Sequence, residues 1–105
     1  MTLLDSAEVV VRRRTAADTA YGPVYSDDGP PMAVACSVRA LTAAETRQLG
    51  WQATAGIRIL ARSWPGDERS AVRWDGADWE PDGPALRRDG SPATAHFQID
   101  CRLAR

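Results

Sequence analysis

Alternation of apolar and polar residues with a period of two is the feature that most limits what this chain can fold into. It is clearest near the end of the sequence, between Ala95 and Leu103. A half-buried strand of an antiparallel sheet has this pattern, because one face packs on the core while the other contacts water. The expected inward set is Ala95, Phe97, Ile99, Cys101 and Leu103, and the outward set is His96, Gln98, Asp100 and Arg102.

The same alternation predicts three earlier strands. One covers Glu8 to Arg14, a second is centred on Cys36, and the longest runs from Gln52 to Arg62. Gly56 lies inside the longest strand and indicates a bulge or a bend, as a closing barrel requires. The expected inward residues of these strands are Val9 and Val11, then Val34, Cys36 and Val38, then Ala53, Ala55, Ile57, Ile59 and Ala61.

A β-hairpin is expected around Asp75-Gly76, a dipeptide typical of two-residue hairpin turns. Pairing outward from this turn puts apolar pairs on one face and a charged pair on the other, and a slip of one residue would mix the two faces. Agreement between turn chemistry and side-chain pairing favours this register. The expected pairs are Trp74 with Ala77, Arg73 with Asp78, and Val72 with Trp79.

One short helix is expected from Ala43 to Leu49. Thr42 and Glu45 have the spacing of a capping box, and Gly50 fits a helix stop.

Two connections remain. The segment 15–32 is long for a compact domain, and such segments are usually functional or disordered. Tyr21, Val24 and Tyr25 would also allow it to form a loose, twisted hairpin. The segment 82–94 is rich in Asp, Gly and Pro and is expected to be loop, with a short strand within 85–88.

The expected fold class is therefore mainly β: a small antiparallel barrel or sandwich of about five to seven strands, with one short helix and a long early loop. A chain of 105 residues has the length of one domain, so we expect a single domain over residues 1–105 with a flexible start over residues 1–7. No apolar run is long enough to span a membrane. Asp5 and Glu8 precede the first apolar run, the reverse of a signal peptide, which favours the cytoplasm.

The sequence has no motif for catalysis, cofactor binding or metal binding. Cys36, Cys101 and His96 are its only cysteines and histidine, too few for a zinc site or a thiol protease. We interpret both cysteines as reduced core residues, and His96 as a surface residue with nothing nearby in sequence to orient it. The expectation is a non-enzymatic protein with no cofactor and no metal.

Charged and aromatic residues supply the candidate binding sites. All 13 basic residues are Arg, and the net charge of −1 argues against a nucleic-acid binder with a basic patch. Arg and Trp are favoured at protein interfaces.

The acidic residues Asp75, Asp78, Glu80 and Asp82 are interpreted as a solvated hairpin edge, with Arg73 as the partner of Asp78. Trp74 and Trp79 are assigned to the core, whereas Trp51 and Trp64 lie at element ends, where exposure is expected. The candidate interface residues are Arg12, Arg14, Trp64, Arg87 and Arg88.

The order of these features resembles the head-to-tail stopper, or head-closure, proteins of long-tailed bacteriophages, especially those of actinobacteria. The shared order is an early Val- and Arg-rich strand, a long loop, and the strand Val34-Ala35-Cys36-Ser37-Val38. A polar turn, the strand end Ile57-Arg58-Ile59-Leu60-Ala61, the turn Pro65-Gly66-Asp67, the hairpin from Val72 to Gly83 and the final strand follow. The hairpin is the most specific part. The chain departs from the family pattern at Pro81 and in the short, Asp- and Pro-rich segment after Gly83.

The resemblance implies a structural virion protein of the phage neck, assembled in the bacterial host cytoplasm. Identical subunits would form a sixfold or twelvefold ring between the portal-side adaptor and the tail terminator or tail tube. The ring would close the channel after packaging, and DNA would pass through it without sequence-specific binding. The loop 15–32 would narrow the lumen through Tyr21, Tyr25, Asp27 and Asp28, whose carboxylates would repel phosphates.

Other functions remain open at this stage. A different neck or tail ring protein is one, although an adaptor should be largely helical and a tail terminator mixed α/β. A single-strand nucleic-acid-binding barrel should carry a basic excess. A small peptide-binding barrel of the SH3-like type is a further alternative.

Overall fold

A computed structural model describes residues 7–27, 29–51, 55–88 and 95–104. These residues form nine strands and one helix. The elements are β1 (Ala7–Arg12), β2 (Arg14–Thr19), β3 (Gly22–Asp27), β4 (Met32–Ala40), α1 (Ala43–Gln48), β5 (Gly56–Ala61), β6 (Ala71–Trp74), β7 (Ala77–Pro81), β8 (Leu86–Arg88) and β9 (His96–Leu103).

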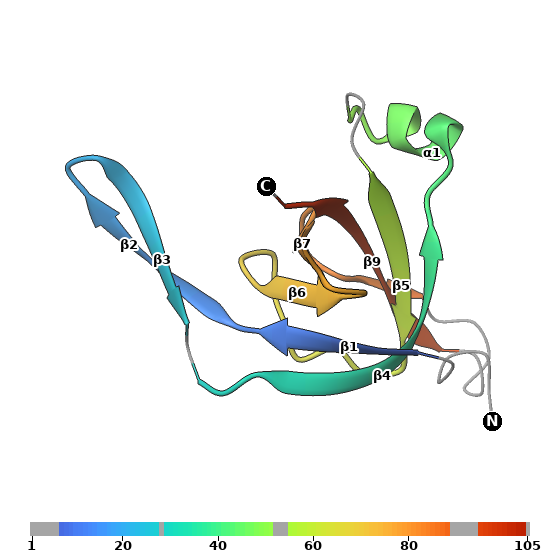
Figure 1. Ribbon diagram of the computed structural model, residues 1–105, viewed down its shortest axis with the longest axis horizontal. Coiled ribbons are helices and arrows are strands. Elements are labelled where there is room, and N and C mark those ends of the chain that lie inside the picture. Colours follow the sequence, from blue (N-terminus) through green and yellow to red (C-terminus); the bar gives the residue numbers. More distant parts are fainter. Residues whose placement is uncertain (1–6, 28, 52–54, 89–94, 105) are drawn as a thin grey trace.

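Six of the strands close into an antiparallel barrel (Figure 1). Their order is β5-β4-β1-β6-β7-β9, and β9 returns to pair with β5 from Gly56↔Arg102 to Ala61↔Phe97. The short strand β8 extends the sheet beside β9, and β2 and β3 form a separate two-stranded sheet. The predicted fold class, a small and mainly β barrel with one short helix, is confirmed.

The core consists of the inward residues that the alternation predicts. Ile57, Ile59 and Ile99 are almost fully buried, and Cys36 and Cys101 are buried and free of disulfides. The pattern weakens at strand ends, since Ala55 and Leu103 are exposed and Phe97 is half-buried. The other apolar core residues are Val9, Val11, Val34, Ala61, Val72 and Trp79.

The β6–β7 hairpin has the predicted register, with Trp74↔Ala77, Arg73↔Asp78 and Val72↔Trp79. Both turn residues have positive φ, 52° at Asp75 and 74° at Gly76, as a type I′ turn requires. Trp79 is buried and Trp74 half-buried, with ring centroids 6.1 Å apart.

The helix α1 also forms as the sequence predicts. The Thr42 hydroxyl accepts from the Glu45 amide, and the Glu45 carboxylate accepts from the Thr42 amide, so the capping box is complete. Gly50 follows the helix with φ of +79°, a value that favours glycine.

Trp51 is a correction to the expected exposure, because its side chain is only 7% exposed. Gly56 explains this burial. A Cβ built at Gly56 would lie 2.5 Å from the Trp51 ring and 2.9 Å from Leu41, so only glycine lets the indole pack here. Gly56 begins β5, and the preceding predicted strand residues 52–54 lie outside the described residues.

The connection 15–32 is largely the β2–β3 hairpin, the more ordered of the two structures that the sequence allowed. The predicted strand from Glu8 to Arg14 divides at Arg13, which separates β1 in the barrel from β2 in the hairpin. The predicted strand within 85–88 is confirmed as β8. The start 1–6 and the loop part 89–94 lie outside the described residues.

Candidate functional site

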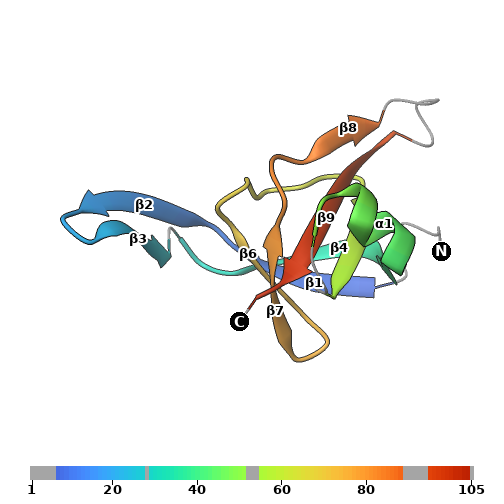
Figure 2. The same ribbon diagram turned by 90° about the horizontal axis from the view of Figure 1, so that it is seen from above.

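The β2–β3 hairpin projects from one end of the barrel (Figures 1 and 2). Its strands pair without interruption from Arg14↔Asp27 to Thr19↔Gly22. At the turn, the Thr19 hydroxyl donates to the Gly22 carbonyl over 2.6 Å and accepts from the Tyr21 amide over 3.2 Å. Gly22 has a φ of +104°, a backbone conformation that residues with a side chain rarely adopt. The turn is therefore specified by local hydrogen bonds rather than by packing.

The hairpin has no buried residue within 14–27. Tyr21 at its tip is 100% exposed, Val24 is 54% exposed and Tyr25 is 48% exposed. The register places Asp18, Tyr25 and Asp27 on one face with Arg14. Of the predicted channel-loop residues, Tyr21 lies at the tip and Tyr25 and Asp27 nearer the base, and Asp28 is outside the described residues.

Two predicted interface arginines lie at or next to the base of the hairpin. The Arg14 Nε donates to the Arg69 carbonyl over 2.6 Å, and its guanidinium lies 5.0 Å from the centroid of the Tyr25 ring. Arg12, the last residue of β1, lies beside Asp78 on β7, with 3.9 Å between Nη2 and Oδ1. Both side chains therefore have partners within the chain, and the Arg14 contact joins the base of the hairpin to the segment before β6.

Trp64 lines an open groove of about 630 Å³ near the base of the hairpin. Its ring is half-buried and packs against the core. The groove runs between the first residues of β4 and the segment after β5. It is lined by Met32, Ala33, Val34, Ala35, Arg62, Ser63, Trp64 and Pro65.

The remaining predicted interface residues, Arg87 and Arg88, lie on β8, away from the hairpin (Figure 2). Both residues are exposed, as is the whole of this short strand. Arg87 stacks over the Phe97 ring at 5.0 Å, and the Arg88 Nε donates to the Gln98 Oε1 over 3.4 Å. The structure therefore does not bring the five predicted interface residues into one patch.

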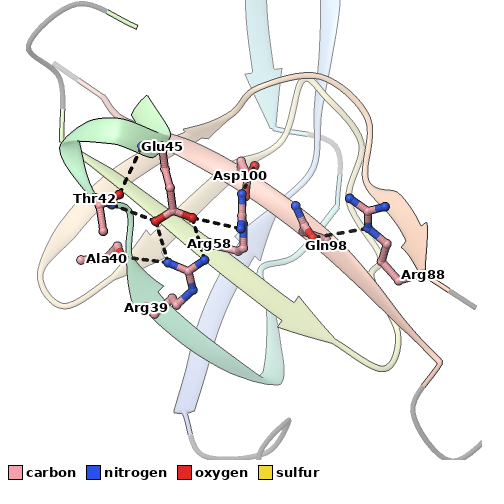
Figure 3. Close-up of polar contacts among 8 residues, drawn as sticks. All are labelled: Arg39, Ala40, Thr42, Glu45, Arg58, Arg88, Gln98 and Asp100. Atoms are coloured by element: carbon pink, nitrogen blue, oxygen red, sulfur yellow. Dashed lines mark hydrogen bonds and ion pairs between the residues drawn. The ribbon is translucent and has the colours of Figure 1, made fainter. Parts of the chain in front are cut away.

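An ion-pair network that the sequence did not indicate joins α1 to the barrel (Figure 3). The Glu45 carboxylate accepts from Arg39 over 2.8 and 2.9 Å and from Arg58 over 3.2 Å. Arg58 in turn donates to both oxygens of Asp100 on β9, over 2.8 and 3.2 Å. The hydrogen bonds from Arg39, and then that from the Thr42 amide, hold the pKa of Glu45 well below its usual range.

The sequence singled out three residues of this network but not the contacts between them. The capping box identified Glu45, and the alternation put Arg58 and Asp100 on outward faces. Their contact follows from the β5–β9 register, which aligns Arg58 with Asp100. Because the network satisfies its own charges, we interpret it as structural.

The described residues contain no group of three or more His, Cys, Asp or Glu side chains that could hold a metal ion. Burial raises the thiol pKa of Cys36 to about 11 and that of Cys101 to about 12, so both stay protonated near neutral pH.

Arg73 contacts Asp78 over 3.0 Å, as expected for the hairpin edge. No helix in the described part of the chain is long and apolar enough to cross a membrane.

Comparison with known proteins finds no family model and no curated protein that matches this chain. The candidate site is therefore defined by its geometry: an exposed, projecting hairpin and a groove at its base.

Proposed function

We propose that this protein is a head-to-tail stopper of a long-tailed bacteriophage, a structural subunit that forms a ring in the neck and closes the DNA channel. The observation that carries the proposal is the β2–β3 hairpin. Five residue steps at about 3.4 Å each give it a reach of roughly 17 Å beyond its base. A segment of this kind, built into a small rigid barrel, can narrow the lumen of a ring.

Two further features support a ring subunit. Each barrel strand has a partner on both sides, so assembly would use side-chain surfaces rather than open barrel edges. The hairpin face with Asp18 and Asp27 is acidic apart from Arg14. Carboxylates near a channel would repel DNA phosphates and keep the passing duplex from binding.

The direct test is electron microscopy of intact particles, with the chain sought between the portal complex and the tail. A ring of this barrel at the neck, with the hairpins around the channel, would support the proposal. Absence of the chain from the neck, with the purified protein binding a cellular peptide or single-stranded nucleic acid, would replace it with the binding-module alternative.

A shortened hairpin tests the plug separately. Replacing residues 17–24 by Asn-Gly keeps the pairs Arg14↔Asp27 and Ala16↔Tyr25 and supplies a two-residue turn. Particles that carry this variant should fill with DNA and then lose it before tails attach. The matched control is Ser26→Thr, at an exposed position of β3, which keeps the hairpin length and should retain DNA. Normal DNA retention by the shortened variant would contradict a channel-closing role.

A further inference from the structure

The β2–β3 hairpin lacks a packing partner of its own. An isolated two-stranded hairpin is at best marginally stable in water. Here the described residues beyond its base give it no buried side chain, while Tyr21 is 100% exposed and Val24 is 54% exposed. These two apolar side chains lie at and next to the tip, where burial against another surface would stabilise the ordered hairpin.

The groove beside Trp64 is a surface of matching chemistry. Met32, Trp64 and Pro65 are half-buried and give it an apolar wall, and its volume of about 630 Å³ is ample for a tyrosine ring. Arg62 is the only charged residue among those that line it, and it is exposed. Asp18 lies next to the turn and supplies the opposite charge at the tip.

The tip and the groove of one subunit are held apart. Met32, at one end of the groove, follows the hairpin base by five residues, since Arg14 pairs with Asp27. The hairpin projects away from the barrel (Figure 1), and its tip lies roughly 17 Å beyond the base. The groove is therefore accessible to the hairpin of another copy rather than to its own.

We propose that the hairpin tip of one subunit docks in the groove of the next, with Tyr21 against Trp64 and Asp18 beside Arg62. Because the two surfaces differ, the contact is head-to-tail and generates a closed ring when the rotation between copies closes. This inference rests on the proposed ring function and names the surfaces that build the ring. A docked hairpin would border the lumen between neighbouring copies, and its tip would lie against the next subunit.

Disulfide trapping between copies tests the contact on the full chain. An Ala20→Cys variant, which keeps Tyr21, and a Ser63→Cys variant, both changed at exposed positions, are mixed at about 1 mM, where even a contact with a Kd near 1 mM is populated. After mild oxidation we expect a covalent heterodimer, and a ladder of larger species from the double variant. The native Cys36 and Cys101 are buried and should not contribute. The matched control pairs Ala20→Cys with Leu86→Cys, a half-exposed position on β8.

Charge reversal gives a second, independent measurement. Asp18→Arg or Arg62→Asp alone should lower the yield of the cross-link between positions 20 and 63 about tenfold or more, because each places like charges together. The double reversal should restore it. Equal trapping with Leu86→Cys, no trapping with Ser63→Cys, or no restoration by the double reversal would overturn the contact.

These outcomes are distinct from those of the neck microscopy. A ring at the neck whose subunits fail to cross-link through these positions leaves the proposed function standing and removes this contact. Specific cross-linking by a protein that is absent from the neck leaves the contact and removes the phage function.

Discussion

The barrel and the β2–β3 hairpin are both antiparallel but differ in how far their side chains are exposed to water. In the barrel, the inward residues are buried, and Val9, Val11 and Ile59 have no exposed surface. In the hairpin, 12 of the 14 residues from Arg14 to Asp27, all except Arg14 and Gly22, count as exposed. The barrel strands are specified by a shared core, and the hairpin is specified by its turn and by contacts at its base.

This difference distinguishes the residues that stabilise the fold from those that the fold leaves exposed on its surface. Removing the hairpin tip would leave every residue of the core in place. An exposed two-stranded extension with aromatic side chains contributes little to the stability of one subunit. Its residues are therefore the ones to test for a role outside the subunit.

The largest expected effect is in the barrel core. Ile59→Ala should lower the free energy of unfolding by about 2–5 kcal/mol, because it leaves a cavity among fully buried neighbours. Val24→Ala on the hairpin should change it by no more than about 0.5 kcal/mol. Urea unfolding of both variants measures the contrast, and similar losses would show that the hairpin is part of the core's cooperative unit.

A smaller loss is expected where the chain packs most tightly around Gly56. Gly56→Ala should cost about 1–3 kcal/mol, since the added methyl overlaps the Trp51 ring. In a Trp51→Ala background, the same substitution should cost clearly less. A double-mutant cycle in urea measures the coupling, and equal costs in both backgrounds would contradict a steric origin.

A third test concerns the ion pairs that join α1 to the barrel. The pKa of Glu45 is lower in the folded protein than its ordinary value of 4.5, so its stabilising contribution is complete above that pH and declines as the pH falls below it. Wild type should therefore be more stable than Glu45→Gln at pH 7, and the difference should shrink at pH 3. Glu68→Gln, at an exposed turn position, is the matched control. A difference that is independent of pH would exclude the carboxylate as its cause.

The smallest effect on stability is expected at the hairpin tip. Tyr21→Ser should leave the unfolding midpoint almost unchanged, because the side chain is fully exposed. Sedimentation of the same variant at high concentration should show weakened self-association, whereas Leu86→Ser on β8 should associate as wild type does. Loss of stability in Tyr21→Ser would mean that the tip packs within its own subunit.

Local sequence signals predicted the elements whose causes are local. Asp75-Gly76 gave the register of the β6–β7 hairpin, and Thr42 with Glu45 gave the start of α1. The alternation identified Ile57, Ile59 and Ile99 as core residues because burial on one face is written directly into the strand.

The sequence alone could not predict features that depend on which strands become neighbours. The burial of Trp51 depends on the missing side chain at Gly56, five residues away, and on the path between them. The Arg58–Asp100 pair depends on barrel closure between β5 and β9. In the candidate site, Tyr21 was singled out through the family resemblance, whereas the groove at Trp64 forms only when β4 and the segment after β5 meet.

The closure between β5 and β9 also has a consequence for how the chain folds. Among the six barrel strands, β9 is the last to be synthesised, and both β5 and β7 need it as a partner. Pairings between residues so far apart in sequence form slowly, after local hairpins such as β6–β7. Until β9 leaves the ribosome, β5 and β7 present unpaired edges that can join the edges of other nascent chains. The nascent protein is thus most prone to aggregate just before its barrel closes.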